Sequence, residues 1–135
     1  MLPVKSIMTE EVIWVTPQTP IYEALHLLTE HKISGLPVVD EDRHVVGILS
    51  EKDVLAILLD KHPDAKKTVS NYMSRDVISF TEDASAIDIC KFFIQSNIRR
   101  VPIIRDNKLV GIVSRRDIVS LILEVKTKMS DFRFS

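Results

Sequence analysis

The sequence GILSEKD at residues 47–53 recurs as GIVSRRD at residues 111–117. Both copies read glycine, two apolar residues, serine, two variable residues and aspartate. The apolar pairs are typical of a strand end, and apolar residues at helical spacing follow each aspartate. Serine is a good helix N-cap, and an aspartate three positions later favours the positive end of a helix. The motif therefore predicts, twice, a strand that passes directly into a helix.

The sequence around the motif repeats as well, first with a shift of 65 residues and then, after a one-residue insertion near Asp42, with a shift of 64. Such a period indicates two structural repeats of about sixty residues. The pairs aligned by the first shift are Val4 with Val69, Met8 with Met73, Val12 with Val77, Ile13 with Ile78, Thr16 with Thr81 and Pro37 with Pro102.

The repeat divides the chain into residues 1–62, a linker at residues 63–68, a second repeat at residues 69–128 and a C-terminal tail at residues 129–135. The joint at residues 61–68 is polar, contains a proline and has no apolar period, as is usual for a linker.

Each repeat is predicted to form a βαββα unit, so the fold class is α/β. A unit of this size cannot bury its apolar sheet face alone, and we expect the two to pack as one pseudo-symmetric module. The apolar excess at Val54–Leu59 and Ile118–Leu123 is assigned to a homodimer interface. The predicted elements are strands at 12–15 and 77–80, helices starting at Pro20 and Ser85, hairpins at 36–49 and 101–113, and closing helices from Glu51 to about Asp60 and from Arg115 to about Lys126.

Composition narrows the class of function. The net charge is −1, so no overall field recommends nucleic acid or an anionic membrane as a partner. Residues 1–68 nevertheless carry −4 and residues 69–135 carry +3. The first thirty residues contain several acidic side chains and no apolar run long enough to span a bilayer, which predicts a cytoplasmic protein without membrane contact. Cys90 is expected to be a buried structural thiol.

Two interpretations of the duplicated motif are open. The serine and aspartate are explained by helix capping alone, which is common. Alternatively, the free N–H groups of a helix N-terminus can bind phosphate, and an aspartate one turn into the helix can accept hydrogen bonds from a ribose diol. Two copies at equivalent positions favour the second interpretation.

The sequence resembles a tandem pair of cystathionine-β-synthase (CBS) domains, an arrangement called a Bateman module. The resemblance covers nearly the whole chain and rests on both Gly-x-x-Ser-x-x-Asp motifs, on Met8-Thr9 and Met73-Ser74, and on the strands at 35–40 and 100–105. It implies a non-catalytic regulatory module that binds AMP, ADP or ATP in two clefts and signals to a partner protein. It also implies a flat, disc-shaped homodimer.

By the family pattern, each cleft joins the Ser-x-x-Asp of one repeat to strands of the other. Apolar strand residues would hold the adenine, aspartate the ribose, and serine with arginine or lysine the phosphate. The cleft with Arg99 and Arg100 has more cations than the cleft with Ser34 and Gly35. One cleft would use Ser50, Lys52, Asp53, Ser74, Val77, Ile78, Arg99, Arg100, Val101 and Pro102. The other would use Ser114, Arg116, Asp117, Thr9, Val12, Ile13, Ser34, Gly35, Leu36 and Pro37.

Other chemistry finds no support in the sequence. The four histidines lack metal-ligand spacing, so no metal site is predicted, and Trp14 is assigned to core or interface. No nucleophile stands beside an evident base, and no catalytic residue is predicted. No cofactor is required; Mg²⁺ would enter only as a companion of ATP. Two alternatives stay open: a constitutive interaction module with empty clefts, and a sensor of another adenosyl compound such as S-adenosylmethionine.

Overall fold

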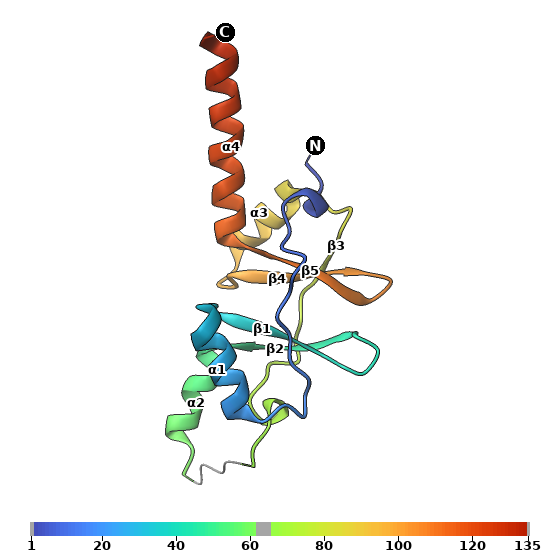
Figure 1. Ribbon diagram of the computed structural model, residues 1–135, viewed down its shortest axis with the longest axis vertical. Helices are drawn as coiled ribbons and strands as arrows, with labels where there is room; N and C mark the ends of the chain where they lie inside the picture. Colours follow the sequence, from blue (N-terminus) through green and yellow to red (C-terminus); the bar gives the residue numbers. More distant parts are fainter. Residues whose placement is uncertain (1, 62–65, 135) are drawn as a thin grey trace. The chain divides into compact units, whose positions relative to one another are not determined.

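The computed structural model describes residues 2–61 and 66–134, in which helices and strands follow the repeated order (Figure 1). The first repeat contains η1 (Val4–Ser6), α1 (Ile21–His31), β1 (Gly35–Val39), β2 (Val45–Ser50) and α2 (Glu51–Leu59). The second contains η2 (Val69–Asn71), β3 (Phe80–Thr81), α3 (Ala86–Gln95), β4 (Arg100–Arg105), β5 (Lys108–Ser114) and α4 (Arg115–Phe134). The mixed α/β class predicted from the sequence is confirmed. Residues 62–65, which include the first half of the predicted linker (63–68), lie outside the described residues.

The two predicted hairpins are present, β1-β2 in the first sheet and β4-β5 in the second. Strands β1 and β2 pair antiparallel, with Leu36 opposite Leu49, and β1 is buried at every position. In the second sheet the order is β3-β4-β5, and β3 pairs parallel to β4. Each hairpin ends where a final helix begins, so both Ser-x-x-Asp motifs lie at a strand-to-helix junction as predicted.

The prediction of a strand at residues 12–15 is wrong, because these residues form no regular strand. Only Val15 pairs, in a parallel bridge with Val38. Its N–H donates to the Pro37 carbonyl at 3.1 Å, and its carbonyl accepts the Val39 N–H at 2.8 Å. The equivalent residue of the second repeat, Phe80, lies in β3 and pairs with Ile103 of β4. The apolar, β-branched residues 12–15 therefore contribute a single bridging residue, Val15, and no regular strand.

Helix α4 is longer than predicted. Its backbone continues to Phe134, beyond the expected end near Lys126 and through most of the expected tail. No glycine or proline interrupts residues 115–134, so nothing in the sequence ends the helix. Among the described residues, no helix has both the length and the apolar character needed to cross a membrane.

The two packing units differ from the two sequence repeats, because the repeats exchange their leading segments. The first packing unit comprises residues 11–78 and 105–109; the second comprises residues 1–10, 79–104 and 110–135. Val4 is fully buried in the core around Ile89 and Val101, whereas Val69 is fully buried in the core around Leu36. Each repeat therefore supplies a core residue to the unit built on the other.

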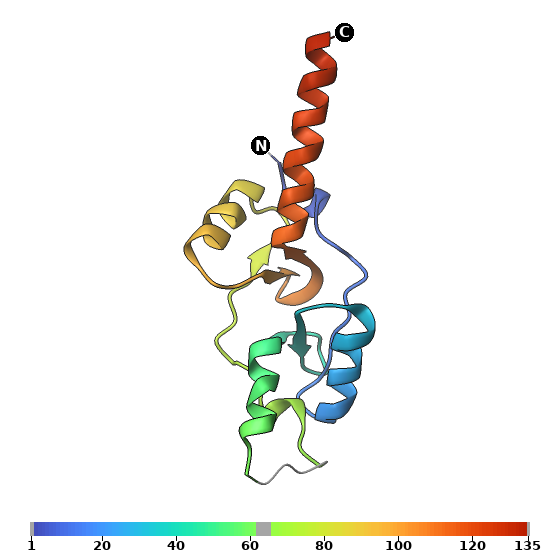
Figure 2. The same cartoon turned by 90° about the vertical axis from the view of Figure 1, so that its left-hand side faces the viewer.

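Backbone hydrogen bonds hold each exchanged segment. The Val4 N–H donates to the Ala84 carbonyl at 2.9 Å, and the Ala86 N–H donates to the Leu2 carbonyl at 2.9 Å. In the first packing unit the Val69 N–H donates to the Thr19 carbonyl at 2.9 Å. Figures 1 and 2 show η1 beside the helices of the second repeat, within the second packing unit. The leading segments are thus built into the cores and are no loose tails.

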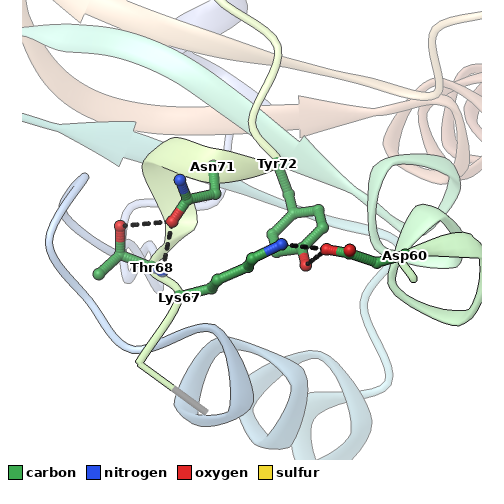
Figure 3. A network of polar contacts seen from close by, with 5 residues as sticks. All are labelled: Asp60, Lys67, Thr68, Asn71 and Tyr72. Carbon is green, nitrogen blue, oxygen red and sulfur yellow. Dashed lines mark hydrogen bonds and ion pairs between the residues drawn. The ribbon is translucent and has the colours of Figure 1, made fainter. Parts of the chain in front are cut away.

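A polar network joins the end of α2 to the residues around η2 (Figure 3). The carboxylate of Asp60 accepts hydrogen bonds from the Lys67 ammonium and, at 3.1 Å, from the Tyr72 hydroxyl. The Asn71 side-chain oxygen accepts the Thr68 N–H at 2.9 Å. The hydrogen bond to Asp60 raises the pKa of Lys67 above its ordinary value, and desolvation, followed by the bond to Asp60, raises the pKa of Tyr72.

The exchange predicts that Val4 stabilises the unit of the opposite repeat. Val4→Ala removes two buried methyl groups and should lower the free energy of unfolding by about 1.5 to 3 kcal/mol. Val119→Ala, at an exposed position of α4, is the control and should change it by less than about 0.5 kcal/mol. Urea unfolding gives both values. Amide hydrogen exchange should accelerate first in α3 and β4; acceleration confined to β1 and β2 would contradict the exchange.

The Asp60 network predicts a loss of stability at alkaline pH. Both raised pKa values mean that the folded state holds the Lys67 and Tyr72 protons more tightly than the unfolded state. Their contribution is therefore complete below about pH 10, where these groups ordinarily titrate, and is lost as the pH rises through the folded pKa values. Asp60→Asn should destabilise at pH 8 and make less difference at pH 11 in urea unfolding. Tyr22→Phe is the control; a gap between Asp60→Asn and the parent that widens with pH would contradict the network.

Candidate functional site

Ser50 and Asp53 form a complete capping box at the start of α2. Asp53 Oδ2 accepts the Ser50 N–H at 2.8 Å and the Ser50 hydroxyl at 2.9 Å, and Ser50 Oγ accepts the Asp53 N–H at 3.2 Å. The serine and the aspartate thus satisfy backbone groups that the strand and the helix leave unpaired. The capping interpretation of this motif is correct for the first repeat.

Ser114 and Asp117 repeat the same geometry at the start of α4. Asp117 Oδ2 accepts the Ser114 N–H at 2.8 Å and the Ser114 hydroxyl at 3.1 Å, and Ser114 Oγ accepts the Asp117 N–H at 3.2 Å. In both motifs the cap uses Oδ2, and no described residue donates a hydrogen bond to Oδ1. Both aspartates are partly exposed. Each motif therefore offers one carboxylate oxygen, held in place by the other, to an external donor.

The exchanged segments bring further predicted site residues to each motif within one packing unit. Ser74 pairs with Ile48, two residues before the capping Ser50, through N–H···O bonds of 2.9 Å in both directions. Thr9 pairs with Ile112 in the same way, at 2.9 and 3.0 Å. Ser74 and Thr9 are both exposed. Their hydroxyls thus belong to the strand edge that leads into each Ser-x-x-Asp motif.

Gly47 and Gly111 allow this close approach. Neither glycine has a positive φ, so its role here is steric. A Cβ on Gly47 would lie 2.9 Å from Met73 Sδ and 2.9 Å from the Ser74 carbonyl oxygen. A Cβ on Gly111 would lie 2.5 Å from Met8 Sδ. The sequence analysis did not assign this contact, although Met8 and Met73 recur with almost the same shift as the two glycines.

A second set of predicted residues lies at the other side of each motif. The Glu51 N–H donates to the Ser34 carbonyl at 2.9 Å, and the Arg115 N–H donates to the Arg99 carbonyl at 2.9 Å. Gly35, Leu36, Pro37, Val101 and Pro102 follow on β1 and β4 and are all buried, whereas Lys52, Arg116 and Arg99 are exposed and Arg100 is half-buried. Val12, Ile13 and Val77 are half-buried, and Ile78 is exposed.

The structure therefore assembles a part of each predicted cleft within a packing unit. The Ser50 motif has Ser74 in its own unit, and the Ser114 motif has Thr9 in its own unit. The residues 99–102 expected with Ser50, and residues 12–37 expected with Ser114, belong to the other unit in each case. The composition of the two complete clefts stays a prediction.

Arg115 has a structural role that the sequence analysis missed. Its Nε donates to the Ile98 carbonyl at 3.0 Å, and its Nη2 donates to the carbonyls of Phe93 and Ser96 at 3.0 and 2.6 Å. These carbonyls lie at the end of α3, where a cation also interacts favourably with the helix dipole. The adjacent motif arginine, Arg116, is exposed as well. The partners lie 17 to 22 residues apart in the sequence, so spacing gave no signal for this contact.

The turn between β1 and β2 gathers Asp40, Asp42 and His44, whose ligand atoms lie within 4.8 Å of one another. The turn itself explains this cluster. Asp40 Oδ1 accepts the backbone N–H groups of Asp42 and His44, both at 2.9 Å, and Arg43 between them has a φ of 67°. The cluster is part of a hairpin turn in which Asp40 and His44 are half-buried and Asp42 is exposed, and it belongs to neither motif.

Comparison with known proteins identifies the class. Residues 4–60 and 69–124 match the CBS domain family, and the chain belongs to that family. Its sequence is 31% identical to protein MJ1225 of Methanocaldococcus jannaschii over 89% of this chain. The chain spans 42% of the length of that relative.

Two solved structures of CBS-domain pairs are similar to this chain. CBSX2 of Arabidopsis thaliana, solved in complex with AMP, has a TM-score of 0.84 and 29% identity, and the match covers 93% of this chain and 99% of the other. The CBS domain pair of protein MJ0100, solved with 5'-methylthioadenosine and S-adenosyl-L-methionine, has a TM-score of 0.80 and 33% identity over 90% and 96% of the two chains. The predicted arrangement of two CBS domains is confirmed.

The two glycine contacts predict different responses to an added methyl group. Each of Gly47→Ala and Gly111→Ala should cost about 1 to 3 kcal/mol of unfolding free energy through overpacking. At Gly111 the nearest atoms belong to the flexible Met8 side chain, so Met8→Ala should relieve Gly111→Ala in a double-mutant cycle. At Gly47 the Ser74 carbonyl oxygen stays in the way, and Met73→Ala should relieve much less. Equal relief in the two cycles, measured by urea unfolding, would contradict the steric assignment.

Proposed function

We propose that this protein is a non-catalytic regulatory module that binds AMP, ADP or ATP at its two Ser-x-x-Asp motifs and signals the bound state to a partner protein. We propose further that it acts as a homodimer in the cytoplasm. The observation that carries the proposal is the capping box found twice, with Oδ1 of Asp53 and Asp117 left to an external donor.

The chemistry of the motif suits a ribose. A cis-diol presents two O–H donors, and an ionised carboxylate only accepts, so the pair forms charge-assisted hydrogen bonds. The cap fixes the carboxylate before the ligand arrives, which lowers the ordering cost of binding. The exposed cations Lys52 and Arg116, next to each aspartate at a helix N-terminus, provide for phosphate.

Phosphate-bearing ligands are favoured over other adenosyl compounds by charge. The proposed site residues include the cations Lys52, Arg99, Arg100 and Arg116. A phosphate gains from such cations, whereas the sulfonium of S-adenosylmethionine is repelled by them. The solved pair with S-adenosyl-L-methionine nevertheless makes that compound the second candidate. Calorimetric titrations with AMP, ADP, ATP, with and without Mg²⁺, and with S-adenosylmethionine rank the candidates directly.

A constitutive interaction module with empty clefts is the alternative from another class. A ligand that binds only the folded protein raises its melting temperature, so nucleotide added at one hundred times its dissociation constant stabilises by about 2.7 kcal/mol. A melting temperature unmoved by millimolar nucleotide would favour the alternative. Incubation with ATP, followed by chromatography of the nucleotide, tests the absence of catalysis separately.

The proposal predicts that Asp53→Asn and Asp117→Asn each weaken one binding event. The single oxygen of the amide can serve the cap, but an NH2 donor then replaces the oxygen that would accept from the ribose diol, and the charge is lost as well, so affinity should fall by about 1.5 to 3 kcal/mol at that site. Calorimetry with AMP should show one weakened site in each variant and two in the double variant.

Asp88→Asn is the matched control. Asp88 stands three residues after the N-cap Ser85 of α3, as Asp53 and Asp117 stand after theirs, but it belongs to no proposed site. It therefore carries the same loss of a carboxylate at a helix N-terminus without a ligand. If all three variants bound AMP like the parent while remaining folded, the assignment of the site to the two motifs would be wrong.

A further inference from the structure

The far part of α4 extends beyond the CBS domains. The family match ends at residue 124, whereas the helix continues to Phe134. In both views this part of α4 stands clear of the rest of its own packing unit (Figures 1 and 2). Every residue from 122 to 128 is exposed. This stretch therefore contributes nothing to the core of its own unit, and its sequence needs another explanation.

Apolar residues of α4 recur at alternating spacings of four and three, at positions 118, 122, 125, 129 and 132. Such spacing places them on one side of a helix, in the pattern by which one helix packs along another. Ile118 is buried in its own unit, whereas Ile122 and Val125 are 57% and 40% exposed. We call positions 122, 125, 129 and 132 the α4 seam. The seam continues a buried row of residues into a part of the helix that its own unit does not cover.

Basic residues flank the α4 seam on both sides. Positions 126 and 133, a lysine and an arginine, lie on one side and Lys128 on the other, each about 60 to 80° around the helix from the middle of the seam. The acidic positions 124 and 131 lie more than about 100° away. Lys128 pairs with Glu124 at 3.2 Å, but the two side chains are 75% and 61% exposed, and an exposed pair of this kind is weak. The charge next to the seam is therefore positive.

This charge pattern selects among the possible occupants of the seam. In paired helices the residues beside the seam face those of the partner, so a second copy would place cations against cations along both flanks. An anionic bilayer is recognised by clusters of about four to eight basic residues. Residues 122–134 carry three basic and two acidic side chains, a net charge of +1. Carboxylates on a partner helix complement the flanks of the seam best.

We infer that the α4 seam binds an amphipathic helix of a different protein, one whose apolar stripe is flanked by glutamate or aspartate. The inference rests on the proposed function and adds to it the chemistry of the partner and the surface that receives it. The seam lies on the same helix as the Ser114 motif, which connects the proposed ligand site to the partner through one continuous backbone. The homodimer of the proposed function does not use this surface.

Two synthetic helices test the inference on the full chain. Each has about four heptads with isoleucine and leucine in its seam; one has glutamate and the other lysine at the flanking positions. Fluorescence anisotropy should show the glutamate helix binding at least about tenfold more tightly than the lysine helix, with a preference that shrinks in 500 mM salt. No binding, equal binding of the two helices, or binding only to vesicles that contain phosphatidylserine would overturn the inference.

Three variants locate the binding surface. Val125→Ser should weaken the glutamate helix at least about tenfold by removing an apolar seam residue. Lys126→Glu should weaken it about three- to tenfold, because it reverses one flanking charge. Lys91→Glu makes the same charge change at an exposed position of α3 and should alter binding by less than about twofold. Equal effects of the two lysine variants would contradict the assignment to the seam.

Light scattering and calorimetry separate this inference from the other proposals. Val125→Ser should keep the molecular mass of the parent; a parent dimer that becomes a monomer on this change would place a second copy on the seam and overturn the inference. AMP calorimetry on the parent and on Val125→Ser should give equal affinities. Loss of AMP binding in the parent would contradict the proposed function while leaving the helix titration to decide the role of the seam, so either can fail alone.

Discussion

Val4 and Val69 each fill the core of the unit built on the other repeat, and most of the molecule depends on that exchange. Without it, each core would lose a buried valine, and β2 and β5 would lose their pairing with Ser74 and Thr9. The exchange also explains why the chain needs two repeats in tandem, since neither has its own leading segment in place. The connectivity of the chain therefore gives each unit residues from both repeats.

The candidate site is a direct product of the same exchange. Each leading segment lies against β2 or β5 at a glycine, where a side chain would meet Met73 or Met8. The strand continues for three residues and becomes a helix at the capping serine. Capping and ligand binding, which compete as explanations of an isolated motif, are compatible here because the carboxylate has two oxygens and the cap uses one.

Local pattern was enough to predict the fold class, the hairpins, the helix starts and both capping residues. These features depend on periodicity and on neighbours within three or four residues. The sequence could not reveal the contacts made across long separations. The Arg115 bonds to the end of α3, the core position of Val4 and the contact of Met8 with Gly111 are of that kind. The prediction of a strand at residues 12–15 was wrong. β-Branched residues indicate a preference for extended backbone, whereas regular pairing depends on where a neighbouring strand ends.

Because α4 is long, a small tilt at the Ser114 motif, where the helix begins, displaces the far end of the helix by a larger distance. Its 20 residues correspond to about 30 Å of helix, and Asp117 lies in the first turn. A rigid rod amplifies motion at its base, so a tilt of about 5° at the motif displaces the far end by about 2.6 Å. Helix α2, with nine residues, amplifies the same tilt by less than half as much. The two motifs are therefore chemically alike, but the same tilt displaces the far end of α4 by more than twice as much as the far end of α2.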